Sequence, residues 1–176
     1  MAWEILDVVL QRTCGAVNAL ARHISITIGH VMTNAQSLQS GRVARILALT
    51  SNTDPRGTLV AIENGINLPF LINRLFYVVG MTGTPRGFHA HRREHQLLVC
   101  ASGSCRIVVD DGAARTEFIL DQADQGLYLP PLLWVEISDF STDCVVIVIG
   151  SDNYDEADYI RDYPTFLAAV DKVAAS

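Results

Sequence analysis

From Arg42 onward the chain consists of short runs of apolar and β-branched residues separated by Gly, Asn, Asp and Pro. Runs of this length are typical of β-strands, and the residues between them favour tight turns, such as the turn expected at Asn52–Gly57. The expected strands span Val43–Thr50, Thr58–Glu63, Phe70–Val79, Leu97–Ala101, Cys105–Val109, Thr116–Leu120, Gly126–Leu129, Trp134–Ser138 and Cys144–Ile149. So many short strands at regular spacing predict an all-β sandwich or barrel.

A helical pattern replaces the strand pattern at both ends of the chain. Apolar residues at helical spacing predict a short C-terminal helix over Pro164–Ala174. They also recur at helical spacing in the first 31 residues, before a polar linker at Thr33–Gly41. We expect residues 1–41 to be an N-terminal extension and linker outside the core fold, and residues 42–176 to form the domain. The alternative is that the first segment is a helix docked on the domain or on a partner subunit.

Composition narrows the class of protein. The 176 residues are 49% hydrophobic and 18% charged, which suits one folded domain with a substantial core. A net charge of −6 argues against a protein that binds nucleic acid. Glu4 and Asp7 make the start a poor signal peptide, and no apolar run there is long enough to span a bilayer. With four cysteines and no CxxC spacing, a cytoplasmic location is expected, with Cys100 and Cys105 as small buried residues.

Three of the five histidines lie in one polar stretch, Arg86–Gln96. If this stretch is extended, the side chains of His89 and His91 project from the same face of the strand. Two neighbouring imidazoles can ligate a metal, transfer protons, or serve only as structural residues with satisfied hydrogen bonds. The acidic run of Asp155, Glu156 and Asp158 is expected to be the solvated start of a helix.

The spacing of His89, His91, Gln96 and Gly103 resembles the first conserved motif of the cupins, whose fold is a double-stranded β-helix or jelly-roll barrel. In metal-binding cupins a glutamate ligand stands at the position of Gln96, and a histidine is often found near that of Val135. Two of the four expected ligands are therefore absent, so the sequence predicts no metal at this site.

Several further blocks are similar to those of the WxcM-like cupins, the dTDP-4-keto-6-deoxyhexose 3,4-ketoisomerases. The similarity covers about Val43 to Leu167, and residues 1–41 lie outside it. The blocks are Asp54-Pro-Arg-Gly57, Leu68-Pro-Phe70, Arg74-Leu-Phe-Tyr77, Arg86-Gly-Phe-His-Ala-His91, Gly126-Leu-Tyr-Leu-Pro-Pro131 and Ser151 to Tyr163.

The resemblance implies a homodimeric cytoplasmic isomerase whose subunits exchange N-terminal strands. It would act on a dTDP-linked keto-deoxysugar, moving the keto group of dTDP-4-keto-6-deoxyglucose from C4 to C3 without a cofactor, in nucleotide-sugar synthesis for surface glycans such as lipopolysaccharide or S-layer glycans. By the same resemblance His89 and His91 are the proton-transferring pair, Tyr77 is a polar active-site residue and Arg86 holds the diphosphate or a sugar oxygen. The other candidate substrate-binding residues are Arg74, Gln96 and Trp134.

Elementary chemistry agrees with this implication. Moving a carbonyl to the adjacent carbon needs a base that removes the C3 proton and an acid that returns a proton at C4, and an imidazole can do either. We favour His91 as the C3 base at this point. The alternatives are a dTDP-sugar 3,5-epimerase, a non-catalytic sugar-binding cupin and, less compatible with Gln96 and Val135, a metal-dependent oxygenase.

Overall fold

The structure is a computed structural model that describes residues 42–174. The expectation for residues 1–41 therefore lies outside the described residues. The strands are β1 (Arg45–Ala48), β2 (Thr50–Asp54), β3 (Gly57–Ala61), β4 (Arg74–Val78), β5 (Arg86–His91), β6 (Gln96–Ser102), β7 (Cys105–Asp110), β8 (Arg115–Leu120), β9 (Gln125–Leu129), β10 (Trp134–Ser138), β11 (Val145–Gly150) and β12 (Tyr159–Ile160). The helices are a 3₁₀ turn, η1 (Glu156–Asp158), and α2 (Tyr163–Ala174).

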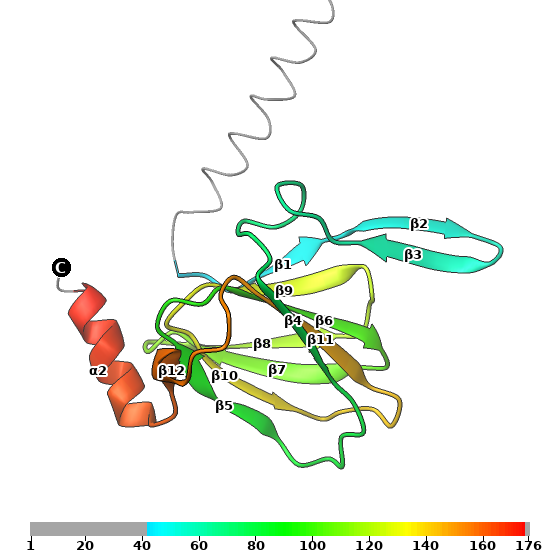
Figure 1. The fold of residues 1–176 in the computed structure, drawn as a ribbon. Helices are drawn as coiled ribbons and strands as arrows, with labels where there is room; N and C mark the ends of the chain where they lie inside the picture. The colour runs from blue at the N-terminus through cyan, green and yellow to red at the C-terminus, as the bar shows by residue number, and fades with distance from the viewer. Residues whose placement is uncertain (1–41, 175–176) are drawn as a thin grey trace, which may run out of the picture. The chain divides into compact units, whose positions relative to one another are not determined.

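The strands form two five-stranded antiparallel sheets that face each other (Figure 1). One sheet has the order β1-β9-β6-β11-β4, and the other has the order β12-β5-β10-β7-β8. The main hydrophobic core lies between them and takes side chains from both, including Leu98 and Val148 from the first sheet and Ile107 and Val135 from the second. The predicted all-β cupin barrel is confirmed.

Alternating residues explain why these segments become strands with one buried face. In β7 the side chains of Cys105, Ile107 and Val109 are buried in the core, whereas Arg106 and Val108 are half-buried on the opposite face. Cys100 and Cys105 are buried free thiols, as expected.

The segment between β1 and β4 differs from the prediction. Asn52–Gly57 was expected to be a turn, but β2 and β3 continue as a two-stranded hairpin as far as Asp54 and Gly57. The turn is tighter because Asp54 accepts hydrogen bonds from the backbone and side chain of Arg56. Strand β4 begins only at Arg74, and the preceding loop is held by a bond from the Ile72 N–H to the Asn64 side chain. The hairpin projects away from the two sheets (Figure 1).

The C-terminal segment covers the outer face of the second sheet. Helix α2 buries Phe166 and Val170 against Ala90, Trp134 and Ile160. Its predicted position is confirmed to within one residue.

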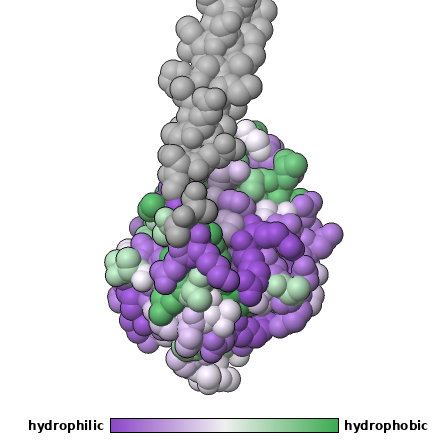
Figure 2. Space-filling view, turned by 90° about the vertical axis from the view of Figure 1, so that its left-hand side faces the viewer, coloured by the Kyte–Doolittle hydropathy of each residue, from purple (hydrophilic) through white to green (hydrophobic). Residues whose placement is uncertain are grey.

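The face shown in Figure 2 is largely hydrophilic, with small hydrophobic patches. In the described part of the chain, no helix has the length and apolar character needed to cross a membrane.

The expected solvated helix start at Asp155–Asp158 is wrong in part. Asp155 caps the short turn η1 by accepting a hydrogen bond from the Ala157 N–H, as a solvated cap would. Asp158, however, is only 4% exposed, and it accepts a hydrogen bond from the backbone N–H of Arg93 at 2.8 Å. This pairing holds the end of η1 against the loop that follows β5, and so brings an acidic side chain beneath the histidine stretch.

Candidate active site

A β-bulge sets the direction of the two histidines. Strand β5 pairs with β10 in a register that shifts between Val135 and Glu136. Gly87 and Phe88 both have positive φ angles, of 88° and 55°, and a side chain at position 87 would collide with the Val135 carbonyl group. Beyond the bulge His89 and His91 lie on one face of β5, with ring centroids 5.1 Å apart.

The hydrogen bonds of His89 define its tautomer. A carbonyl oxygen can only accept, so the Nδ1 atom of His89 must donate to the Gly87 carbonyl, 3.0 Å away. The proton therefore resides on Nδ1, and Nε2 carries a lone pair. Within residues 42–174 this Nε2 atom has no hydrogen-bond partner. Burial lowers the pKa of His89, so the neutral, basic form is favoured near neutral pH.

The environment of His91 is different. Its Nδ1 donates to the Asp158 carboxylate at 2.9 Å, and its Nε2 accepts a bond from the side-chain nitrogen of Gln96 at 3.1 Å. The ring is therefore neutral and its two nitrogens are both occupied. Burial, which outweighs the hydrogen bond to Asp158, lowers the pKa of His91 to about 4.

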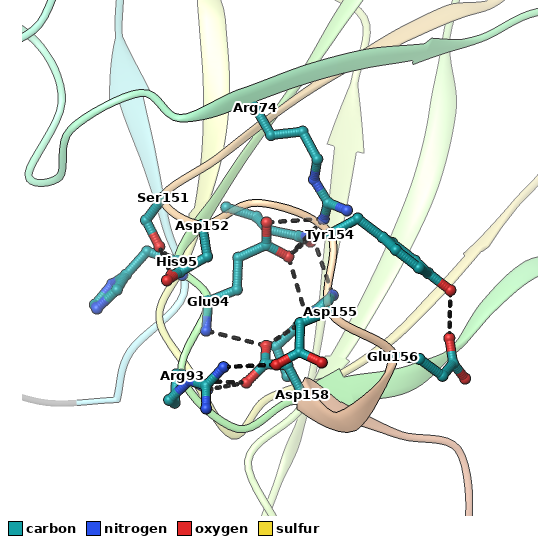
Figure 3. Close-up of polar contacts among 12 residues, drawn as sticks. Arg74, Arg93, Glu94, His95, Ser151, Asp152, Tyr154, Asp155, Glu156 and Asp158 are labelled. Atoms are coloured by element: carbon teal, nitrogen blue, oxygen red, sulfur yellow. Dashed lines mark hydrogen bonds and ion pairs between the residues drawn. The ribbon is translucent and has the colours of Figure 1, made fainter.

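A buried ion pair supports this arrangement. Glu94 lies between Arg74 and Asp158 (Figure 3). The guanidinium of Arg74 donates to both oxygens of Glu94 at 2.8 Å, and Gln96 donates to one of them at 3.0 Å. Burial raises the pKa of Glu94, and the charge of Arg74 opposes that rise. Because the guanidinium supplies two charge-assisted bonds to it, the buried carboxylate is compensated in its ionised form.

The two sheets enclose a cavity of about 490 Å³, and the ring of His89 forms part of its wall. The polar residues that line it with His89 are Gln96, Arg86, Tyr159 and Arg161, and the apolar ones include Val78, Leu98, Val135, Val146 and Val148. His91 lies behind this wall and is only 7% exposed. The cavity thus offers one accessible imidazole, two cationic groups and a largely apolar floor.

Tyr159 and Arg161 also line the cavity, although the sequence did not indicate either of them as a candidate. Strand β12 pairs with β5 so that Tyr159 lies opposite His91. The Tyr159 ring is 4.3 Å from the ring of His91 and 5.0 Å from that of His89, and the Arg161 guanidinium lies 4.4 Å above it. The sequence did contain one indication of them. Both lie in the family-like block from Ser151 to Tyr163, and their two-residue spacing places them on one face of an extended segment.

Three predicted site residues are not brought to the cavity. Tyr77 is 66% exposed, since Phe76 and Val78 are the residues of β4 that face inward. Trp134 is buried against α2, with its ring edge-on to that of Tyr163. Arg74 is held by Glu94. His95, which lies in the same stretch, instead bonds to the hydroxyl of Tyr128.

Two groups of described residues have the spacing to hold a metal. They are His91, Glu94 and Asp158, and the three thiols of Cys100, Cys105 and Cys144. In the first group the Nδ1–H of His91 and the donors Arg74 and Gln96 already satisfy the carboxylates. In the second, burial raises the pKa of Cys100 to about 12, so the thiol stays protonated. The residues of the first group therefore fit a hydrogen-bonded network better than a metal site, and the three thiols fit the hydrophobic core better than a metal site.

Two facing antiparallel sheets around a cavity lined by one of two neighbouring histidines define a cupin-type barrel. The family model described as "FdtA: WxcM-like, C-terminal" matches residues 42–171, and the chain belongs to this family. The resemblance identified from the sequence is confirmed.

Relatives of known activity were also found. A protein of Aneurinibacillus thermoaerophilus described as TDP-4-oxo-6-deoxy-alpha-D-glucose-3,4-oxoisomerase is 50% identical over 121 residues, covering 68% of this chain and 87% of the relative. The structure of QdtA, a sugar 3,4-ketoisomerase from Thermoanaerobacterium thermosaccharolyticum in complex with TDP, is 34% identical, with a TM-score of 0.72 over 74% of this chain and 96% of that one. A TDP-quinovose 3,4-ketoisomerase from Campylobacter jejuni is 40% identical, with a TM-score of 0.69 over 73% and 99% of the two chains.

Proposed function

We propose that this protein is an isomerase that converts dTDP-4-keto-6-deoxy-D-glucose to a dTDP-3-keto-6-deoxyhexose. The observation that carries the proposal is the ring of His89, which lines the cavity with an unprotonated Nε2, in a chain 50% identical to a 3,4-oxoisomerase. A neutral imidazole beside an apolar cavity is suited to taking a proton from a carbon next to a carbonyl group.

The net result of the proposed reaction is that one proton leaves C3 and one is added at C4, while another passes from the C3 oxygen to the C4 oxygen. No electrons are exchanged with a cofactor. His89 Nε2 takes the proton from C3, the C3–C4 bond becomes double, and the C4 carbonyl oxygen gains a proton to give an enediol. The C3 hydroxyl then loses its proton as its oxygen becomes the new carbonyl, and C4 receives a proton. The geometry favours His89 over His91 as the base, contrary to the preference from the sequence, because the Nε2 of His91 is occupied by Gln96.

The cationic groups of the cavity suit the remaining parts of such a substrate. Arg86 and Arg161 both line it, and planar guanidinium groups bind phosphate oxygens through paired hydrogen bonds. The hydroxyl of Tyr159 is a further donor for an enediolate oxygen beside the imidazoles. Tyr77, Arg74 and Trp134 have no direct part in this proposal, since none of them lines the cavity.

We further propose that the protein is a cytoplasmic homodimer with exchanged N-terminal strands, acting in the synthesis of sugars for surface glycans. Two features support the dimer. The hairpin β2–β3 is a separate two-stranded sheet, and the edge strand β4 exposes Leu75 and Tyr77 on its outer face. Sedimentation velocity should show a dimer for the wild type and dissociation for Leu75→Asp. A wild-type monomer that turns over normally would exclude this part of the proposal.

The central test is incubation with dTDP-4-keto-6-deoxyglucose in D₂O, followed by NMR of the sugar. A ketoisomerase moves the carbonyl signal from C4 to C3 and introduces deuterium at C3 or C4. A 3,5-epimerase instead exchanges the C5 proton and leaves the carbonyl at C4. Binding without any exchange would identify a non-catalytic sugar-binding protein.

A further inference from the structure

Glu94 is a buried carboxylate for which the proposed reaction has no direct use. It does not line the cavity, and its side chain is 2% exposed. A side chain at position 150 of β11 would overlap the Glu94 carboxylate, so the glycine there leaves the space that Glu94 occupies. The carboxylate also receives two bonds from Arg74. Local packing and charge therefore hold Glu94 in one place.

The position of Glu94 determines which end of the Gln96 amide faces His91. The nitrogen of that amide lies 3.0 Å from a Glu94 oxygen and 3.1 Å from the Nε2 of His91. An ionised carboxylate can only accept hydrogen bonds, so it requires the amide nitrogen rather than the amide oxygen at this position. The same nitrogen then offers its second N–H to His91.

The consequence for His91 is a defined hydrogen-bond direction at both ring nitrogens. Asp158 accepts from Nδ1 at 2.9 Å, a Glu94 oxygen lies 3.2 Å from the same nitrogen, and the amide N–H donates to Nε2. If the amide were turned round, its oxygen would face Nε2 and would be satisfied only by a protonated Nε2. We infer that Glu94 is a positioning residue, which orients the Gln96 amide so that His91 is held with an unprotonated, hydrogen-bonded Nε2 next to His89.

The inference can be tested without substrate through the N–H···N hydrogen bond itself. In ¹⁵N-labelled wild-type protein, NMR should detect a scalar coupling across the bond between the side-chain nitrogen of Gln96 and the Nε2 of His91. In Glu94→Gln the amide can turn round, so the coupling should disappear. Glu117→Gln is the matched control, because Glu117 also pairs with an arginine but lies on the exposed surface.

The turnover measurement rests on the proposed function and gives a second result. For histidines that ligate metals, removing the outer hydrogen-bond partner typically costs about 10- to 100-fold in activity, and we take the same order for a histidine in a proton-transfer site. For Glu94→Gln we expect a loss of this size in kcat with little change in KM, because Glu94 does not line the cavity, and no change for Glu117→Gln. If the wild type shows the coupling but no ketoisomerase activity, the proposed function fails and the positioning role stands.

Two outcomes would overturn the inference. One is the absence of the coupling in the wild type, and the other is a folded Glu94→Gln protein with the coupling and kcat both intact. If Glu94→Gln does not fold, Gln96→Met removes the amide and leaves the Arg74–Glu94 pair in place. It should show the same loss in kcat, and wild-type turnover in Gln96→Met would equally refute the positioning role.

Discussion

The side chain of Asp158 accepts a hydrogen bond from Nδ1 of His91 at 2.9 Å, although the two residues are 67 positions apart in the chain. The bond joins β5 to the short turn η1, and it orients an imidazole that would otherwise rotate about its side-chain bonds. Together with the bond from Gln96 it holds the ring behind the cavity wall, whereas burial, which lowers the pKa of His91, keeps the ring neutral. His89, in contrast, remains accessible, so the two histidines have different environments on one strand.

This asymmetry predicts different effects of replacing the two histidines. His89→Asn should lose at least about 10²–10⁴-fold in turnover, the usual contribution of general acid–base catalysis, and should no longer exchange the C3 proton with D₂O. His91→Asn should also lose turnover but retain some C3 exchange. The two losses should not add in the double variant, since both residues act on one proton path. C3 exchange that survives in His89→Asn and is abolished in His91→Asn would assign the base to His91 instead.

Metal independence is the second prediction. Metal-binding cupins have a glutamate ligand at the position of Gln96 and often a histidine near that of Val135. The buried carboxylates near His91 are satisfied by protein donors. Dialysis against a strong chelator should therefore leave kcat unchanged. Elemental analysis of the active protein serves as the control. Stoichiometric zinc, iron or manganese whose removal abolishes activity would contradict the prediction.

The low pKa of His91 predicts how stability depends on pH. Its folded value is about 4 and its ordinary value is 6.5, so below pH 6.5 the unfolded chain binds a proton that the folded protein does not. The contribution of neutral His91 to the free energy of unfolding is therefore complete above about pH 6.5, and it is lost as the pH falls towards 4. At 1.36 kcal/mol per unit of difference between the two pKa values, this group accounts for roughly 3 kcal/mol of the free energy of unfolding.

Urea unfolding at pH 7 and at pH 4.5 measures this dependence. The free energy of unfolding should fall more steeply for the wild type than for His91→Asn, which lacks the titrating group. Equal falls in the two proteins would show that His91 does not titrate differently in the folded and unfolded states.

The space at Gly150 gives a fourth prediction. The added methyl group of Gly150→Ala would displace the Glu94 carboxylate, and overpacking of this kind typically costs about 1–3 kcal/mol of stability. Turnover should fall as well. Gly126→Ala is a matched control, because its methyl group would press on Leu97 in the same sheet but away from Glu94. Thermal unfolding and steady-state kinetics should show destabilisation in both variants and a kcat loss only in Gly150→Ala.

The final prediction concerns the first part of the chain. The family similarity covers residues 42–171, so a protein beginning at Gly41 should fold and turn over. Circular dichroism, sedimentation and the isomerase assay would compare it with the full chain. A loss of more than about 2 kcal/mol in stability, beyond the usual effect of one substitution, would show that residues 1–40 contribute to the folded structure.

The sequence by itself determined the strand content, the C-terminal helix, the cupin barrel and the family. These depend on short-range patterns: alternating apolar residues in segments such as Cys105–Val109, turn residues between strands, and the spacing of His89, His91 and Gly103. The same alternation placed His89 and His91 on one face of β5. It could not show that Tyr77 lies on the outer face of β4, because an apolar strand with two partly exposed faces has no clear inward side.

Only the tertiary structure decided which polar residues meet. Asp158, Tyr159 and Arg161 reach the histidines because β12 pairs with β5, and a two-residue strand leaves almost no pattern in the sequence. The tertiary structure also determines why His89 and His91 have different hydrogen-bond partners. A ring nitrogen acts as donor or acceptor according to its partner, and the partners of His91 come from separate parts of the chain, Gln96 in β6 and Asp158 in η1. Residue spacing along β5 contains no information about those partners, so the sequence could identify the pair but not the different environments of its two members.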